Sequence, residues 1–257
     1  MISAFPTTKA YFIAGLSLSF LISAGMIHDG RSLPAAFLGF LFGVSISWLI
    51  SSLIALTNHR KLLNILYREM KPKDFIAVYY PVAKNDKLRK NIHFSMMCFL
   101  SNAYSAAGEY DIAMEVLNSI QVLDSRKQQQ SKAILTGNRC DIYCAMENIV
   151  LAKKEYSDLK TMVNAGETSQ KSILDLLKVT INLLEENVSE EDCEIVRSTL
   201  KGNLTPLFQL QLRYLLAQLY EQQGEYEFAQ TYYEETANGN EQLAIVRKAK
   251  IHLNKGV

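Results

Sequence analysis

Apolar residues run without interruption through two stretches near the start of the chain. The seventeen residues from Tyr11 to Ile27 contain no charge, and neither do the twenty-four from Leu33 to Leu56. At about 1.5 Å per residue, both stretches reach the length a helix needs to cross the roughly 30 Å core of a bilayer, the first only just. Because five residues join them, we expect residues 1–57 to form a transmembrane hairpin with spans at 11–27 and 33–56.

Two other interpretations fit this pattern. One is a buried pair of helices in a soluble protein, but such helices are rarely apolar on every face. The other is a cleaved signal peptide, because Lys9, an apolar stretch and the small residues Ser23, Ala24 and Gly25 approximate its three regions. Even then the second stretch would stop transfer and hold the rest of the chain in the cytosol.

Small residues recur at every fourth position in both stretches, which places each set on one face of its helix. They are Gly15, Ser19 and Ser23 in the first stretch, and Gly39, Gly43, Ser47 and Ser51 in the second. Such faces let helix backbones approach closely within a membrane. We expect the two faces to pack on each other in the hairpin; homo-dimerisation through the Gly39 and Gly43 face is the alternative.

Beyond residue 57 the apolar positions follow the period of helices, and no alternating pattern is long enough for a strand. Pro72 and Pro206 stand where a first helical turn begins, and Gly108 and Gly224 stand where a left-handed residue would end a helix. The sequence therefore predicts an all-α fold for residues 58–257. The expected helices are 59–70, 73–84, 88–107, 110–122, 127–152, 155–165, 169–187, 189–201, 206–223, 226–237 and 240–254.

Two of these helix pairs resemble each other at equal offsets. The segments 103–113 and 219–229 each carry Tyr, Gly, Tyr and Ala in the same positions. This pattern resembles the tetratricopeptide repeat (TPR), a helix-turn-helix unit of about 34 residues. Small residues let its two helices cross closely, and Gly makes the turn. The resemblance implies a TPR-like helical-repeat domain over residues 58–257, closed by a C-terminal capping helix at 240–254.

TPR domains bind an extended or helical peptide in a concave groove, so the resemblance implies a protein or peptide partner here. The corresponding groove positions are Ser95, Cys98, Asn102 and Ser105 in one repeat and Gln211, Tyr214, Gln218 and Glu221 in the other. They lack the Lys and Arg side chains with which some TPR domains hold a terminal carboxylate. Recognition through polar contacts to a peptide backbone is therefore expected.

The basic residues that flank the two apolar stretches indicate how the hairpin is oriented in the membrane. Lys9 precedes the first stretch, Arg31 stands alone between the two, and five basic residues follow the second between Arg60 and Lys73. By the positive-inside rule we expect a multi-pass protein of the cell membrane with both termini in the cytosol. From Thr57 onward Lys and Arg balance Asp and Glu, 25 against 25, so the domain has no electrostatic footprint for nucleic acid.

The stretch from Arg60 to Lys90 is the exception to this balance. It holds nine Lys and Arg residues against Glu69, Asp74 and Asp86. Basic segments next to a membrane are attracted to anionic lipid by about 1 kcal/mol per charge near the surface. We expect lipid contact here, although topogenesis alone would explain the residues up to Lys73.

No candidate chemistry emerges from the remaining residues. The four cysteines form no CxxC pair, and Cys140 and Cys144 lie one helical turn apart without further ligands nearby. The sequence contains no phosphate-binding Gly loop, metalloprotease or hydrolase motif. We therefore expect no enzyme, cofactor or metal. The function indicated is a membrane-tethered interaction scaffold or adaptor, and the alternative is a structural subunit whose hairpin makes the specific contacts.

Overall fold

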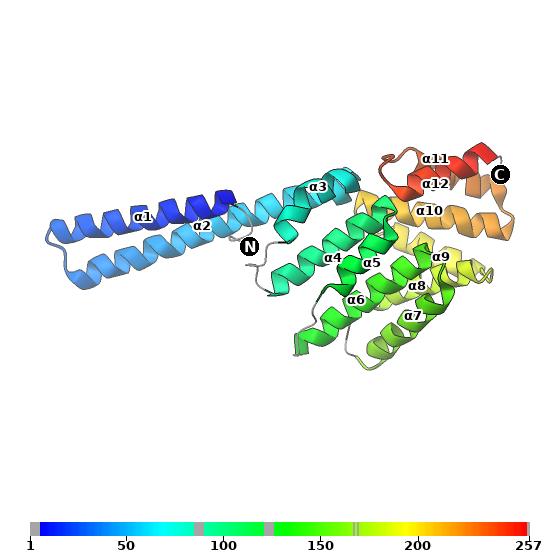
Figure 1. The fold of residues 1–257 in the computed structure, drawn as a ribbon, viewed down its shortest axis with the longest axis horizontal. Helices are drawn as coiled ribbons and strands as arrows, with labels where there is room; N and C mark the ends of the chain where they lie inside the picture. Colours follow the sequence, from blue (N-terminus) through cyan, green and yellow to red (C-terminus); the bar gives the residue numbers. More distant parts are fainter. Residues whose placement is uncertain (1–5, 85–89, 121–125, 167, 169, 256–257) are drawn as a thin grey trace. The chain divides into compact units, whose positions relative to one another are not determined.

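The computed structural model describes residues 6–84, 90–120, 126–166, 168 and 170–255. Within these ranges every regular element is a helix, which confirms the all-α prediction (Figure 1). The chain divides into two compact units, one comprising Met1–Leu63 and Val78–His93, the other Asn64–Ala77 and Phe94–Val257. The helices are α1 (Pro6–His28), α2 (Leu33–Tyr67), α3 (Pro72–Ala83), α4 (Lys90–Ala107), α5 (Tyr110–Asn118), α6 (Arg126–Ala145), α7 (Ile149–Asn164), α8 (Lys171–Leu184), α9 (Glu190–Leu200), α10 (Pro206–Gln223), α11 (Tyr226–Ala237) and α12 (Ala244–Lys255).

The first unit contains the expected hairpin. Helices α1 and α2 run side by side in opposite directions (Figure 1). The reversal between them depends on Gly30, whose φ of +76° is left-handed. The amide of Arg31 donates to the carbonyl of Met26 at 3.0 Å and that of Gly30 to Ile27 at 3.1 Å, which satisfies carbonyls at the end of α1.

Helix α2 is longer than expected. Separate elements at 33–56 and 59–70 were predicted, but a single helix extends from Leu33 to Tyr67, so the boundary expected at residue 57 falls inside it. Thr57, Asn58 and His59 look like a break, yet none of them is Gly or Pro. Thr57 Oγ1 donates to the carbonyl of Leu53 at 2.9 Å, so its hydroxyl is satisfied by the helix itself.

The second unit repeats one kind of turn. Gly108 and Gly224, where a left-handed residue was predicted, have φ of +85° and +81°. Glu147 and Glu186 take the same conformation, with φ of +58° and +55°. In all four turns the left-handed residue and its successor donate their amides to carbonyls three and five residues back, at 2.9–3.2 Å. The same helix end therefore closes α4, α6, α8 and α10.

The turn at Glu147 corrects one predicted element. A single helix was expected over 127–152, whereas α6 ends at Ala145 and α7 begins at Ile149. The side chain of Asn148 caps α7 by accepting a hydrogen bond from the amide of Leu151 at 3.2 Å. An N-cap residue was thus the available signal for this break.

Small residues allow three of the helix pairs to cross closely. Each pair has a fully buried small residue on its first helix and a fully buried Ala twelve positions later. Ser101 Oγ donates to the carbonyl of Ala113 at 2.9 Å, and Cys140 Sγ donates to that of Ala152 at 3.3 Å. The residue pairs are Ser101 with Ala113, Cys140 with Ala152, and Ala217 with Ala229.

Replacement of Glu147 by Gly is expected to stabilise the protein by about 0.5–1 kcal/mol. The left-handed conformation strains a residue with a Cβ but not Gly, and the relief exceeds the extra chain entropy that Gly loses on folding. Denaturant unfolding of the detergent-solubilised chain measures this change. The matched control is Lys154→Gly inside α7, which should cost about 1 kcal/mol. A destabilised Glu147→Gly variant would contradict the assigned turn.

Candidate functional site

The structure places the small residues of the hairpin between its two helices. A Cβ added to Gly15 would lie 2.3 Å from Ser47 Oγ, and one added to Gly43 would lie 2.4 Å from Ser19 Oγ. A Cβ on Gly39 would lie 3.1 Å from Met26 Sδ. Ser23 and Ser51 are also buried. The faces identified from the spacing therefore contact the neighbouring helix of the same hairpin.

Three of the serines on these faces donate hydrogen bonds within their own helices. Ser19 Oγ donates to the carbonyl of Gly15 at 2.7 Å, Ser23 Oγ to that of Ser19 at 2.9 Å, and Ser47 Oγ to that of Gly43 at 2.8 Å. These bonds satisfy the hydroxyls of Ser19, Ser23 and Ser47, whereas the buried hydroxyl of Ser51 has no hydrogen-bond partner. The hairpin interface is thus built from close backbone approach rather than from large side chains.

The outer surface of the hairpin is apolar. Two helices, Thr8–His28 and Leu33–Tyr67, are long and apolar enough to cross a membrane. Of the most apolar 18-residue stretch in each, only 11% and 6% is buried. Large side chains such as Phe20, Phe42 and Trp48 are 65%, 70% and 57% exposed. Exposed apolar surfaces of this size are typical of sites that contact a membrane or a protein partner.

The basic stretch from Arg60 to Lys90 is only partly described. Arg60 and Lys61 are exposed on the last turns of α2, and Lys71 Nζ pairs with Glu69 at 3.2 Å. Lys87 and Arg89 lie outside the described residues, as does the side chain of Lys90. The exposed pair at Arg60 and Lys61 directly follows the apolar part of α2.

Two of the four groove positions predicted on α4, Cys98 and Asn102, are occupied by contacts within the domain. Asn102 Nδ2 donates to Tyr67 Oη at 3.4 Å, and the Tyr67 ring packs edge-on against Phe99 at 6.1 Å between centroids. Cys98 is buried, and this burial raises the pKa of its thiol to about 12. Ser105 is half-buried, and Ser95 is exposed.

Two of the four groove positions predicted on α10, Tyr214 and Glu221, contact α11 or α12. Tyr214 is buried against the edge of the Tyr233 ring, with 5.9 Å between centroids. Glu221 Oε2 accepts a hydrogen bond from Tyr233 Oη at 2.5 Å, and Glu221 Oε1 lies 3.3 Å from His252 Nδ1. Gln211 and Gln218 are half-buried. Burial and the neighbouring Glu221 raise the pKa of Tyr233, so its hydroxyl stays protonated and donates.

Helix α12 makes contacts that the sequence did not suggest. The predicted capping helix 240–254 begins later, at Ala244, because Asn240 Oδ1 holds the amide of Gln242 in a turn at 2.9 Å. Arg247 Nη2 donates to the carbonyl of Ala107 at 2.8 Å. Residues 242–252 thus contact four helices, α3, α4, α10 and α11. A capping helix would cover only the last helix pair of the domain.

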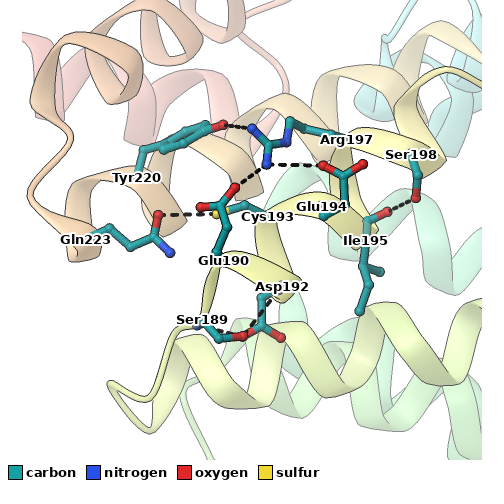
Figure 2. Close-up of polar contacts among 10 residues, drawn as sticks. All are labelled: Ser189, Glu190, Asp192, Cys193, Glu194, Ile195, Arg197, Ser198, Tyr220 and Gln223. Carbon is teal, nitrogen blue, oxygen red and sulfur yellow. Dashed lines mark hydrogen bonds and ion pairs between the residues drawn. The ribbon is translucent and has the colours of Figure 1, made fainter.

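A polar cluster joins α9 to α10 (Figure 2). The Arg197 guanidinium donates to Tyr220 Oη at 3.1 Å, lies 3.1 Å from Glu194 Oε2, and also pairs with Glu190. Cys193 Sγ lies 3.5 Å from the side-chain oxygen of Gln223. Burial raises the pKa of this thiol to about 11, which favours the protonated form at neutral pH. The cluster holds two helices together.

Asp192 is the buried acid of this region, and its loss is expected to cost about 2–3 kcal/mol. Its carboxylate accepts from the Ser189 amide at 2.9 Å and from Asn182 Nδ2 at 3.0 Å, which completes a capping box at the start of α9. Asp192→Ala removes the carboxylate half of the capping box and leaves the Ser189 backbone amide and the Asn182 side-chain amide unpaired. Urea unfolding tests this. The exposed neighbour is the control, since Glu191→Ala should change stability by less than about 0.5 kcal/mol.

Neither a metal site nor a similar protein identifies the function of this chain. Among the described residues, no three His, Cys, Asp or Glu side chains gather to hold a metal ion. Comparison of the chain with protein-family models, curated proteins and solved structures gives no match.

Proposed function

We propose that this chain is a membrane-tethered scaffold or adaptor that binds a protein or peptide partner through its helical domain. The observation that carries the proposal is the apolar exterior of the hairpin. Its small residues face inward, while Phe20, Phe42 and Trp48 point outward on α1 and α2. Insertion into a bilayer satisfies this surface, and the hairpin then fixes the helical domain at the membrane.

The orientation belongs to the same proposal. Arg60 and Lys61 end the apolar part of α2, and Lys9 stands at the start of α1, so the basic residues favour both ends of the hairpin in the cytosol. At that position Arg60 and Lys61 lie in the headgroup layer, where anionic lipids attract them. The cell membrane is the proposed location.

The TPR-like pattern supports a binding role for the helical domain. Its helix pairs share a left-handed turn and small crossing residues, as the repeat resemblance implies. Large apolar side chains are also exposed on this domain, notably Val150 at 78% and Phe228 at 57%. These two side chains are accessible to a partner and give positions at which its binding can be probed.

Photo-cross-linking of the full chain in its membrane tests the adaptor role. A photoreactive amino acid replaces Val150 or Phe228 on the helical domain, or Phe20 or Phe42 on the hairpin. An adaptor gives protein adducts at Val150 or Phe228. The alternative, a subunit that binds through its hairpin, gives protein adducts only at Phe20 or Phe42, and that result would exclude the adaptor. The exposed polar position Lys154 serves as the background control.

A further inference from the structure

The chain reverses direction after α2, and the second half of α3 returns along the hairpin. Met70 lies in this turn with a left-handed φ of +58°. Beyond the turn α3 lies beside the end of α2 (Figure 1), and the ring centroids of Tyr79 and His59 are 5.9 Å apart. Val78–His93 accordingly belong to the same compact unit as the hairpin.

The end of α3 lies level with the end of the apolar stretch 33–56. Both helices rise by about 1.5 Å per residue, so the residue four positions after Tyr79 lies opposite the residue four positions before His59. These two residues are Ala83 and Ala55, and both are fully buried. Ala55 stands in the last turn of the stretch expected to span the bilayer. When the hairpin is inserted, the end of α3 therefore reaches the boundary of the bilayer core.

The exposed face of α3 becomes apolar toward this end. In the first turn Lys73 and Asp74 are exposed. In the second half the exposed residues are Val78, at 45%, and Pro81, before Lys84 closes the face. A helix that faces water normally keeps polar residues on its outer side, so the second half of α3 is suited to the edge of a membrane.

Lys84 points back along this apolar face. Its Nζ lies 4.5 Å from the centre of the Tyr80 ring, one turn earlier in the helix. When the hairpin is inserted, α3 runs toward the bilayer, so this earlier turn lies farther from the bilayer core. A lysine at a membrane edge extends its ammonium group in this direction, toward the headgroups, and tyrosines are enriched at the same depth. The pair thus has the residue types and the direction of an interfacial anchor.

Basic residues of the two hairpin helices lie near the same level. Arg60 and Lys61 are exposed just beyond the apolar part of α2. Lys9 is also exposed, and it precedes Gly15 by as many positions as the end of the apolar part follows Ser47, which contacts Gly15. No acidic residue occurs in the segments that meet at this level, which are 6–28, 53–68 and 75–84. The surface is therefore suited to anions.

We propose that the second half of α3 lies in the cytosolic headgroup layer and forms, with the hairpin, a binding surface for anionic phospholipids. We call this surface the basic collar and define it as Lys9, Arg60, Lys61, Tyr80 and Lys84. Its four cations bind the phosphate and carboxylate groups of the lipids, which are abundant in a cytosolic leaflet. The inference rests on the proposed function in requiring an inserted hairpin, and it makes anionic lipid a ligand of the chain.

Spin labels measure the depth of α3 in vesicles that contain the full chain and equal amounts of phosphatidylcholine and phosphatidylserine. One label is attached in each of the variants Val78→Cys, Lys73→Cys and Phe42→Cys. Its relaxation by oxygen, which concentrates in the bilayer, is compared with its relaxation by a water-soluble nickel chelate. The native cysteines are buried, and the unsubstituted chain gives the background. Oxygen should be the stronger relaxant at positions 78 and 42, and the chelate at position 73.

Spin-labelled lipids measure the headgroup preference of the full chain without a protein label. Traces of labelled phosphatidylserine or phosphatidylcholine in phosphatidylcholine vesicles report the fraction of each lipid held at the protein. Phosphatidylserine should be favoured at least about 2-fold. Arg60→Gln combined with Lys84→Gln should remove most of this preference. The matched control, Lys154→Gln combined with Lys160→Gln, removes the same charge from exposed positions of α7 and should leave the preference intact.

Two results would overturn the inference and leave the hairpin inserted. In the first, the chelate is the stronger relaxant at positions 78 and 73 while oxygen is at position 42, so that α3 lies in water. In the second, phosphatidylserine is not favoured, or its preference survives in the variant that lacks Arg60 and Lys84, so that the basic collar binds no anionic lipid. A label at position 42 that the chelate relaxes more strongly would instead contradict the proposed function itself.

Discussion

Gly43→Ile is expected to separate the two helices of the hairpin. The first atom added to Gly43 would lie 2.4 Å from Ser19 Oγ and 2.9 Å from Ser19 Cβ, closer than real side chains approach. The rest of the Ile side chain adds to this overlap. Gly15→Ile should act in the same way through Ser47. Overpacking typically costs about 1–3 kcal/mol, and lipid supplies no hydrophobic force to offset it.

Spin labels at positions 20 and 42 measure this separation, because both side chains are exposed and the labels disturb no contact. The wild-type background should give one narrow distance between the labels, and Gly43→Ile should broaden it or lengthen it. Gly25→Ile is the matched control, since nothing lies within 4 Å of its added Cβ. Leu41→Ile should also have little effect. A chain that carries a single label reports dimerisation, because it gives a label-to-label distance only when two chains associate. If such a distance is observed and Gly43→Ile abolishes it, the Gly43 face belongs to a dimer interface instead.

The second large effect is expected at the turns between paired helices. Gly224→Val should destabilise the domain by about 2 kcal/mol or more, because a β-branched residue is strained at a φ of +81°. Gly108→Val should cost more than this. Its added Cβ would also lie 3.0 Å from the Cβ of Ala244 on α12, whereas nothing lies within 4 Å at Gly224.

Thermal and denaturant unfolding of the full chain compare these variants. The control glycine is Gly137 in α6, where an added Cβ would have its nearest neighbours at 3.7 Å. Gly137→Ala, which adds only that Cβ, should therefore change stability little, whereas Gly108→Ala should destabilise the domain. Equal stabilities for Gly108→Ala and Gly137→Ala would contradict both the left-handed turn and the contact between that turn and α12.

The sequence predicted those features that residue type alone determines. The spacing of Gly and Ser in the apolar stretches identified the faces that meet in the hairpin, because only small residues permit that approach. Gly108 and Gly224 marked helix ends because Gly adopts positive φ without strain. The turn at Glu147 was missed because Glu in the same conformation carries no such signal, and only the N-cap Asn148 pointed to it.

The contacts of α12 could not be predicted from the sequence. Gln242 meets Asp74 across 168 positions of the chain, and Arg247 meets Ala107 across 140. A Gln and an Arg on a polar helix face look the same in sequence whether they are solvated or cap another helix. The groove positions on α10 were inferred from a repeat resemblance that takes no account of a helix that packs on them. Contacts between residues so far apart in the sequence depend on the packing of the whole domain.

The proposed function requires a hairpin inserted in a membrane with the helical domain on the cytosolic side. Labelling of intact cells with a membrane-impermeant maleimide tests this in one experiment. Ser32→Cys places a thiol at an exposed position between α1 and α2, Val150→Cys places one at an exposed position on the helical domain, and the four native cysteines are buried. This topology predicts that the thiol at position 32 reacts in intact cells and that the thiol at position 150 reacts only after the membrane is permeabilised. Reaction at position 150 in intact cells, or no reaction at position 32 until permeabilisation, would contradict it.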